Sequence, residues 1–230
     1  MKYPDLIAID GPAGVGKSTI GEMVARELGF LYFDTGIMYR AATFAALRAL
    51  GEVSDEKAVS QIAGQIQIDV RAPSLEDKRK NDVLVNGEDV TWLIREQYVE
   101  KNVSQVSAYE GVRDAMTSAQ RVIGKRGRVV MVGRDIGTVV FPKAKVKIFL
   151  TASAEERARR RYAEKLQLGE SVDYETILAE IKARDEIDTN REIAPLRPAK
   201  DAVIIDTDNL SIEEVFNKVM EIIRQKAKKN

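Results

Sequence analysis

The chain contains neither cysteine nor histidine among its 230 residues. Without cysteine there is no disulfide framework, no thiolate nucleophile and no cysteine-based metal site. Without histidine, the usual general base and the commonest neutral metal ligand are also missing. Together these absences exclude Ser-His-Asp hydrolysis, zinc hydrolysis and Cys-His chemistry.

Long apolar runs and an excess of charge are absent as well. No segment approaches the ~18 consecutive apolar residues of a membrane span, and the apolar stretch near the N-terminus is too short for a signal peptide. We therefore expect a cytoplasmic protein without a membrane partner. Lys+Arg and Asp+Glu both number 36, a balance that does not suggest nucleic acid as a partner. Nothing in the sequence demands a second subunit, so a monomer is expected.

Short apolar runs typical of buried strands recur along the chain, at 6–9, 31–33, 129–132, 146–150 and 202–205. Longer helical patterns lie between most of them. This alternation predicts an α/β fold in which a parallel sheet is flanked by helices on both faces.

The interval between the second and third runs is too long for a single crossover between parallel strands. A helix is predicted over 35–50, and short antiparallel strands are predicted within about 64–102. A second helical region, 104–124, then leads back to the sheet. We therefore expect 64–102 to form a small inserted subdomain.

The segment "GPAGVGKST" directly after the first apolar run matches the phosphate-binding loop pattern G-x-x-x-x-G-K-S. Glycines allow backbone N–H groups to approach a densely anionic triphosphate, and the following helix directs its positive end at it. Lys17 would contact the β- and γ-phosphates, and Ser18 would ligate Mg²⁺. The strand before and the helix after disfavour the alternative of a glycine-rich turn without a ligand. The predicted triphosphate site consists of Gly11, Pro12, Ala13, Gly14, Val15, Gly16, Lys17, Ser18 and Thr19.

Two classes of triphosphate-binding protein do not fit the rest of the chain. A GTPase would need N-K-x-D, and "NKVM" at 217–220 lacks the aspartate. A motor or AAA-type ATPase usually has an acidic pair after its central strand, where this chain has Gly133-Arg134-Asp135 instead. Because ligands sit at the carboxyl ends of parallel strands, Arg134 and Asp135 should lie beside the phosphate loop. The alternative is a local ion pair on the surface.

Further arginines are placed to receive anions. Arg40 follows the second strand. A capping box of Ser153 and Glu156 would open a later helix, and this helix carries several more arginines. Each helical face alone could equally be a solvated surface. The number of arginines beside a phosphate loop favours a role in binding anions. The predicted faces are Arg157, Arg160 and Arg161 on one helix, and Arg184, Asp188 and Arg191 on the next, about 174–189.

Arginines suit transfer from one phosphate to another. A phosphate acceptor is largely dianionic at neutral pH, so it needs no strong base, and the main obstacle is repulsion between the two anions. Guanidinium groups relieve that repulsion and orient both partners. A kinase acting on a sugar or small alcohol would depend more on an aspartate base, for which Asp34 or Asp135 could serve.

Several segments together resemble the bacterial cytidylate (CMP) kinases, a family of nucleoside monophosphate kinases. These are "IDGPAGVGKST", "FDTGIMYR", "VGRDIGTVVFP", "KIFLTAS" and "PLRPAKDAVIIDT", which follow one another over nearly the whole chain. The resemblance implies a P-loop NTPase fold with a five-stranded parallel sheet. It also implies an inserted NMP-binding subdomain at 64–102, a core of 1–63 and 103–230, and an arginine-rich helical lid at about 154–190.

The resemblance further implies a reaction and a set of site residues. The reaction is phosphoryl transfer from ATP, with Mg²⁺ held by Ser18, to CMP or dCMP. Catalytic roles would fall to Lys17, Arg134, Asp135 and Arg184, with Arg157 on the ATP side of the lid. One minor departure is Ser18 itself, where some relatives have glycine. The acceptor would be bound by Thr35, Tyr39, Arg40, Ser104, Arg113, Arg134 and Asp135, with Asp188 and Arg191 near its ribose.

Two alternatives remain at this stage. The chain could be another small-acceptor P-loop kinase, such as a shikimate or dephospho-coenzyme A kinase. It could also be a non-catalytic nucleotide- or RNA-binding module whose basic helices hold a polyanion. An assay of acceptor specificity separates all three.

Overall fold

A computed structural model describes residues 3–228 and shows a parallel sheet at the centre of the fold. The sheet has five strands in the order β2-β6-β1-β7-β8, each parallel to its neighbours. The prediction of a five-stranded parallel sheet flanked by helices is therefore confirmed. The strands are β1 (Leu6–Asp10), β2 (Leu31–Asp34), β6 (Val129–Gly133), β7 (Val146–Thr151) and β8 (Val203–Asp206).

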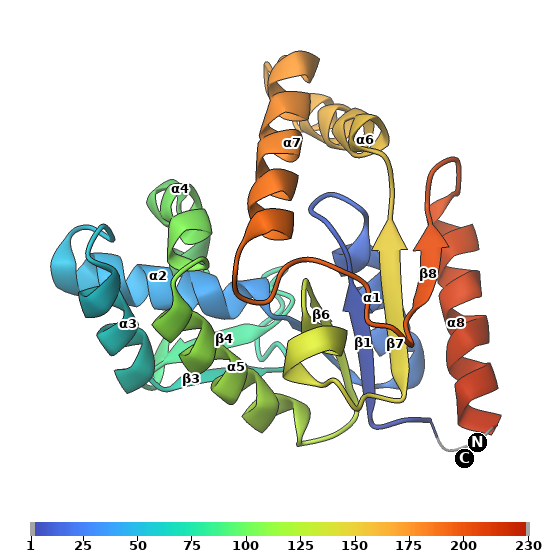
Figure 1. Cartoon of the computed structure of the whole chain (residues 1–230), viewed down its shortest axis with the longest axis horizontal. Helices are drawn as coiled ribbons and strands as arrows, with labels where there is room; N and C mark the ends of the chain where they lie inside the picture. The colour runs from blue at the N-terminus through green and yellow to red at the C-terminus, as the bar shows by residue number, and fades with distance from the viewer. Residues whose placement is uncertain (1–2, 229–230) are drawn as a thin grey trace.

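Helices cover both faces of the sheet because successive strand residues point to opposite sides. Ile7 and Ile9 of β1 pack into a core with α1 (Lys17–Leu28) and α8 (Ile212–Lys228). Ala8, between them, belongs to a second core that also contains residues of α2 and α5. In Figure 1, α8 lies on one side of the sheet, and α2 and α5 lie on the other. The bounds of the latter two are Gly36–Leu50 for α2 and Glu110–Gly124 for α5.

A separate antiparallel sheet lies in the interval between β2 and β6. Its strands are β3 (Ile68–Arg71), β4 (Asp82–Val85) and β5 (Glu88–Asp89), paired in that order. All three lie inside 64–102, where short antiparallel strands were expected. Asn86 and Gly87 both have positive φ, 51° and 85°, which is the conformation that a two-residue hairpin loop favours.

The small sheet is fastened to the core strand β2 by one buried side chain. Asn81, only 5% exposed, donates from Nδ2 to the carbonyl oxygen of Tyr32 at 2.7 Å. The neighbouring Lys80 forms an ion pair with Glu22 of α1. Within the small sheet, the Arg79 guanidinium contacts the carboxylates of three aspartates. These contacts hold the small sheet against β2 and α1.

The helices of this interval differ from the prediction in two respects. Helix α3 (Glu56–Gln65) lies in a stretch for which no element was predicted. The single helical region predicted over 104–124 is in fact two helices, α4 (Gln97–Val106) and α5. One local and one long-range hydrogen bond hold the break between them: Arg113 donates to the carbonyl oxygen of Ser107 at 3.0 Å, and the Tyr109 hydroxyl donates to that of Val53 at 2.8 Å. A short 3₁₀ turn, η1 (Leu93–Arg95), precedes α4.

Two further helices, α6 (Ala154–Gln167) and α7 (Tyr174–Asn190), stand above the carboxyl ends of β1 and β7 (Figure 1). Half of the predicted capping box is present, since the Glu156 N–H donates to Ser153 Oγ at 3.2 Å. The return bond was wrongly predicted: the Ser153 N–H donates to Asp208 Oδ1 at 3.0 Å, and the Glu156 carboxylate pairs with Arg159 and Arg160. Across 3–228, no helix combines the length and the apolar character that crossing a membrane requires.

Candidate active site

A pocket of about 1020 Å³ opens where the carboxyl ends of β1, β2 and β6 meet α2, α4 and α7. Cationic side chains in its lining are twice as numerous as anionic ones, ten against five. Such an excess in a partly enclosed space favours anionic ligands. The cations are Lys17, Arg40, Lys80, Arg95, Lys101, Arg113, Arg134, Arg161, Arg184 and Arg191.

The loop between β1 and α1 forms one wall of this pocket. Gly11, Gly14 and Gly16 all have positive φ, at 151°, 74° and 94°, a region that side chains other than glycine's rarely adopt. At Gly11 space is also limiting, because a Cβ atom would lie 2.2 Å from the carbonyl oxygen of Leu150. The backbone of this loop is thus shaped by its glycines, as a phosphate cradle requires.

Lys17 is the buried cation of the loop. The residue is only 7% exposed, and its Nζ donates to the carbonyl oxygen of Pro12 at 2.5 Å. Burial, and next the positive charge of Arg134, lower the pKa of Lys17 well below its ordinary value. An anion bound here would offset both effects, so the site gains most from a ligand of high negative charge.

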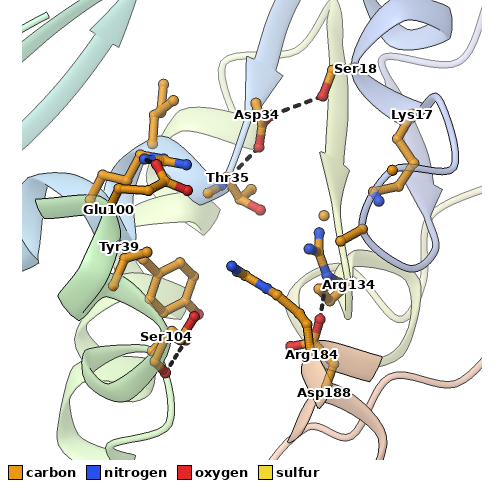
Figure 2. Close-up of a pocket in the computed structure, with 18 of the residues that line it drawn as sticks. Lys17, Ser18, Asp34, Thr35, Tyr39, Glu100, Ser104, Arg134, Arg184 and Asp188 are labelled. Atoms are coloured by element: carbon orange, nitrogen blue, oxygen red, sulfur yellow. Dashed lines mark hydrogen bonds and ion pairs between the residues drawn. The ribbon is translucent and has the colours of Figure 1, made fainter. Parts of the chain in front are cut away.

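Oxygen atoms suited to a magnesium ion lie next to the loop. The Ser18 hydroxyl donates to Asp34 Oδ2 at 3.2 Å, while Asp34 Oδ1 accepts from the Gly36 N–H at 2.9 Å (Figure 2). Within the described part of the chain, no cluster of three or more carboxylate, thiol or imidazole side chains could hold a metal ion. Mg²⁺ usually takes one or two protein oxygens and completes its shell with water and substrate phosphates. Ser18 and Asp34 fit that manner of binding.

Arg134 and Asp135 leave β6 beside the loop, as predicted, but they do not pair with each other. Arg134 donates from Nε to Asp188 Oδ2 of α7 at 2.8 Å. Asp135, 5% exposed, accepts from Arg113 Nη2 of α5 at 2.6 Å. The two residues therefore connect different walls of the pocket, and the alternative of a local surface ion pair is wrong.

A buried carboxylate fixes the turn that carries this pair. Asp10, the last residue of β1, accepts the N–H groups of Ile136 at 2.8 Å and Gly137 at 2.7 Å. These residues open η2 (Ile136–Val140), a π-helical turn. Burial raises the pKa of Asp10 to about 6 against the lowering effect of the two hydrogen bonds. Sequence reasoning did not single out Asp10, because its partners Ile136 and Gly137 lie far along the chain.

The face of α7 predicted from spacing does point into the pocket. Arg184, Asp188 and Arg191 all line it, and in Figure 2 the Arg184 side chain reaches between the Lys17 wall and the Tyr39 wall. Burial and then Arg134 lower the pKa of Arg184. Burial alone would raise the pKa of Asp188, but Arg134, Arg184 and Arg191 hold it below its ordinary value. Opposite charges thus interlock α7 with the β6 turn.

The opposite wall is formed by α2, α4 and α5. The Thr35 hydroxyl donates to the carbonyl oxygen of Val132 at 2.9 Å, and the Arg113 guanidinium lies 5.4 Å from the centre of the Tyr39 ring. Burial raises the pKa of Tyr39 to about 12, so its hydroxyl is protonated at neutral pH. Among the described residues, Arg113 Nε and Arg191 Nη2 are buried donors without an acceptor. Such donors are costly unless a ligand uses them.

The predicted site residues are thus mostly brought together. Every predicted acceptor residue lines the pocket, as do Ala13, Gly14, Lys17 and Ser18 of the loop. Arg157 does not line it. That guanidinium is buried between the carbonyl oxygen of Ala13, 3.1 Å from Nη1, and the Asp185 carboxylate. Arg161, on the same predicted face, is in the lining instead. Sequence reasoning missed Glu100 and three cations of the lining, namely Lys80, Arg95 and Lys101.

Comparison with known proteins finds relatives of the whole chain. The sequence model of the cytidylate kinase family matches residues 7–225. A cytidylate kinase from Bacillus velezensis is 49% identical over 223 residues, covering 96% of this chain and 97% of that protein. One from Carboxydothermus hydrogenoformans is 50% identical over 220 residues, with 96% and 97% covered. Among solved structures, an uncharacterized protein from Eubacterium ventriosum has a TM-score of 0.51 at 13% identity, with 96% and 98% covered, which indicates a shared fold alone.

Proposed function

Because this chain belongs to the cytidylate kinase family, we propose that it transfers the terminal phosphoryl group of ATP to CMP or dCMP, with Mg²⁺ as the metal, giving ADP and CDP or dCDP. The observation that carries the proposal is a single pocket with a phosphate loop on one wall, a cationic acceptor wall opposite, and Arg184 between them. We further propose that the chain acts as a monomer, since nothing in its sequence demands a second subunit.

The loop wall would hold the donor. Its backbone N–H groups and Lys17 would bind the phosphates of ATP, and Ser18, with Asp34 beside it, would hold the metal. When bound, Mg²⁺ supplies positive charge to the β- and γ-phosphate oxygens. We assign the remaining loop residues to the same task through their backbone. For Arg157 we propose a supporting role, because its contact with Ala13 fixes the loop while leaving no guanidinium face in the pocket.

The opposite wall would hold the acceptor. Arg40 offers a guanidinium to its phosphate, and the buried donors Arg113 Nε and Arg191 Nη2 offer hydrogen bonds to neutral polar groups of base and ribose. Tyr39, a protonated hydroxyl on an apolar ring, provides a surface for the nucleotide's flat parts. Thr35, Ser104, Asp135 and Asp188 complete the wall that we propose.

The reaction itself would need charge stabilisation and little proton transfer. A nucleotide's phosphate is mostly dianionic at neutral pH and can attack directly. Arg134 and Arg184 lie between the two walls, where they would neutralise charge on the group in transit. The aspartate-base alternative is less well supported, since Asp135 is buried against Arg113 and Asp34 is bonded to Ser18 and Gly36.

The experiment that tests this proposal is a steady-state assay with MgATP and a panel of acceptors. We expect CMP and dCMP to be turned over with the highest kcat/KM, and UMP, AMP, shikimate and dephospho-coenzyme A to be poor substrates. Equal turnover of UMP or AMP and CMP would refute the acceptor assignment. Tight, steeply salt-dependent retention on nucleic acid with no turnover would favour the binding-module alternative.

A further inference from the structure

Glu100 is an acidic side chain of the pocket that pairs with a pocket arginine without being buried in the core. Glu100, in the first turn of α4, forms an ion pair with Arg40 of α2. The hydrogen bond from Arg40 lowers the pKa of Glu100, and the charges of Arg184 and Arg161 act in the same direction. Three arginines of the pocket, Arg40, Arg184 and Arg161, therefore interact electrostatically with this one carboxylate.

The other acidic residues that pair with pocket arginines are held differently. Asp135 and Asp188 are 5% and 6% exposed, and each is bonded to an arginine from a different element. The Glu100 side chain is 49% exposed and its only ion pair is with Arg40 among the described residues. Burial keeps the first two carboxylates in place, whereas Glu100 can turn into solvent at little cost. Among the described acidic residues that pair with pocket arginines, Glu100 is therefore the displaceable one.

An arriving phosphate would compete for the same guanidinium. Glu100 carries one negative charge, while a nucleotide phosphate carries about −1.5 to −2 at neutral pH and offers three acceptor oxygens to the arginine fork. The exchange therefore favours the phosphate, but part of the binding free energy is consumed in breaking the existing pair. A nucleoside has no phosphate with which to displace Glu100 from Arg40.

We propose that Glu100 is a counter-ion that occupies Arg40 until the acceptor's phosphate displaces it, and that it thereby limits the affinity for phosphorylated acceptors and products. This inference rests on the proposed role of the α2–α4 wall in binding a monophosphate. Its consequence for turnover is direct, because a site that held the charged product too tightly would release it slowly.

The test is calorimetry of the chain with two matched ligand pairs, CMP with cytidine and AMP with adenosine, on wild type and Glu100→Gln. We expect Glu100→Gln to bind CMP about two- to fivefold more tightly, the range that an exposed ion pair supports, and cytidine with unchanged affinity. In steady state the KM for CMP should fall without a rise in kcat. Glu100→Ala should act in the same way, which separates loss of charge from local repacking.

The matched control is Glu88→Gln. Glu88 pairs through Oε2 with Nη1 of Arg48 at 2.6 Å, another α2 arginine outside the pocket, and its side chain is also 49% exposed. This variant should leave both CMP and cytidine binding unchanged.

The inference is overturned if Glu100→Gln binds CMP as weakly as wild type or more weakly, or if CMP and cytidine change by the same factor. A wild type that prefers AMP to CMP overturns the acceptor assignment alone, and AMP with adenosine then reports on Glu100. If neither monophosphate binds, both proposals fail.

Discussion

The buried pair of Arg113 and Asp135 allows the sharpest stability prediction. Their side chains are 3% and 6% exposed, and Nη2 lies 2.6 Å from Oδ2. Replacing Arg113 by methionine keeps most of the apolar stem but leaves the Asp135 carboxylate buried and unpaired. The carbonyl oxygen of Ser107 loses its 3.0 Å donor as well. We expect the loss of one partner of such a pair to destabilise the fold by about 3–5 kcal/mol.

That magnitude is large for a single domain, whose free energy of unfolding is typically about 5–15 kcal/mol. For a chain of this length it corresponds to a fall in Tm of about 6–20 °C. The double variant Arg113→Met/Asp135→Asn removes the stranded charge together with its partner. It should therefore be destabilised by clearly less than the sum of the two single variants.

Urea unfolding at pH 7, followed by circular dichroism, measures these differences. Arg71→Met is the matched control, since Arg71 pairs with Asp69 at 2.6 Å but its side chain is 63% exposed. It should change the free energy of unfolding by less than about 1 kcal/mol. A change below 1 kcal/mol in Arg113→Met, or strict additivity in the double variant, would refute the assignment of this pair as a buried, mutually dependent unit.

Three further changes test the phosphate loop and the residues next to it. Arg134→Ala should lower kcat by at least ~100-fold because a charge-stabilising donor is lost, and an unchanged kcat in steady state would remove Arg134 from the mechanism. Gly11→Ala, whose Cβ would lie 2.2 Å from a backbone oxygen, should weaken ATP binding in titrations at least ~10-fold, whereas Gly51→Ala, with open space around its Cβ, should not. Asp10 has a pKa raised from 3.8 to about 6, so its stabilising contribution is present below pH 3.8 and is lost as the pH rises through 6. The difference in unfolding free energy between wild type and Asp10→Asn should fall by about 3 kcal/mol over that range, and a flat or rising difference would contradict the burial of this carboxylate.

Periodicity and loop patterns predicted the parts of the fold that local sequence controls. The three central strands of the sheet, β6, β1 and β7, are largely apolar runs because both of their faces are covered. The cap at Gly29, with φ 63°, follows from the same kind of local rule. The break between α4 and α5 could not be predicted in this way, since Tyr109 holds it through Val53, a partner 56 residues earlier in the chain.

In the site, too, local sequence predicted some features and distant contacts set the others. Spacing placed Arg184, Asp188 and Arg191 on one face, and the structure turns that face into the pocket. Spacing could not decide which arginine of α6 reaches the pocket. Arg157 is drawn into the core by Asp185 of α7, a contact between helices that no local pattern encodes.

Glu100 and Asp10 were missed for a related reason. Each gains its meaning only from a partner far along the chain, Arg40 for Glu100 and the N–H groups of Ile136 and Gly137 for Asp10. A lone carboxylate in a sequence with 36 acidic residues carries no comparable signal.

The most direct test of the account is whether two nucleotides bind one chain at once. CMP would be titrated by calorimetry into protein saturated with Mg²⁺ and a non-hydrolysable ATP analogue. The account predicts that one CMP binds per chain while the analogue stays bound, because the two occupy opposite walls of one pocket. Displacement of the analogue by CMP, or no uptake of CMP by folded protein, would contradict it.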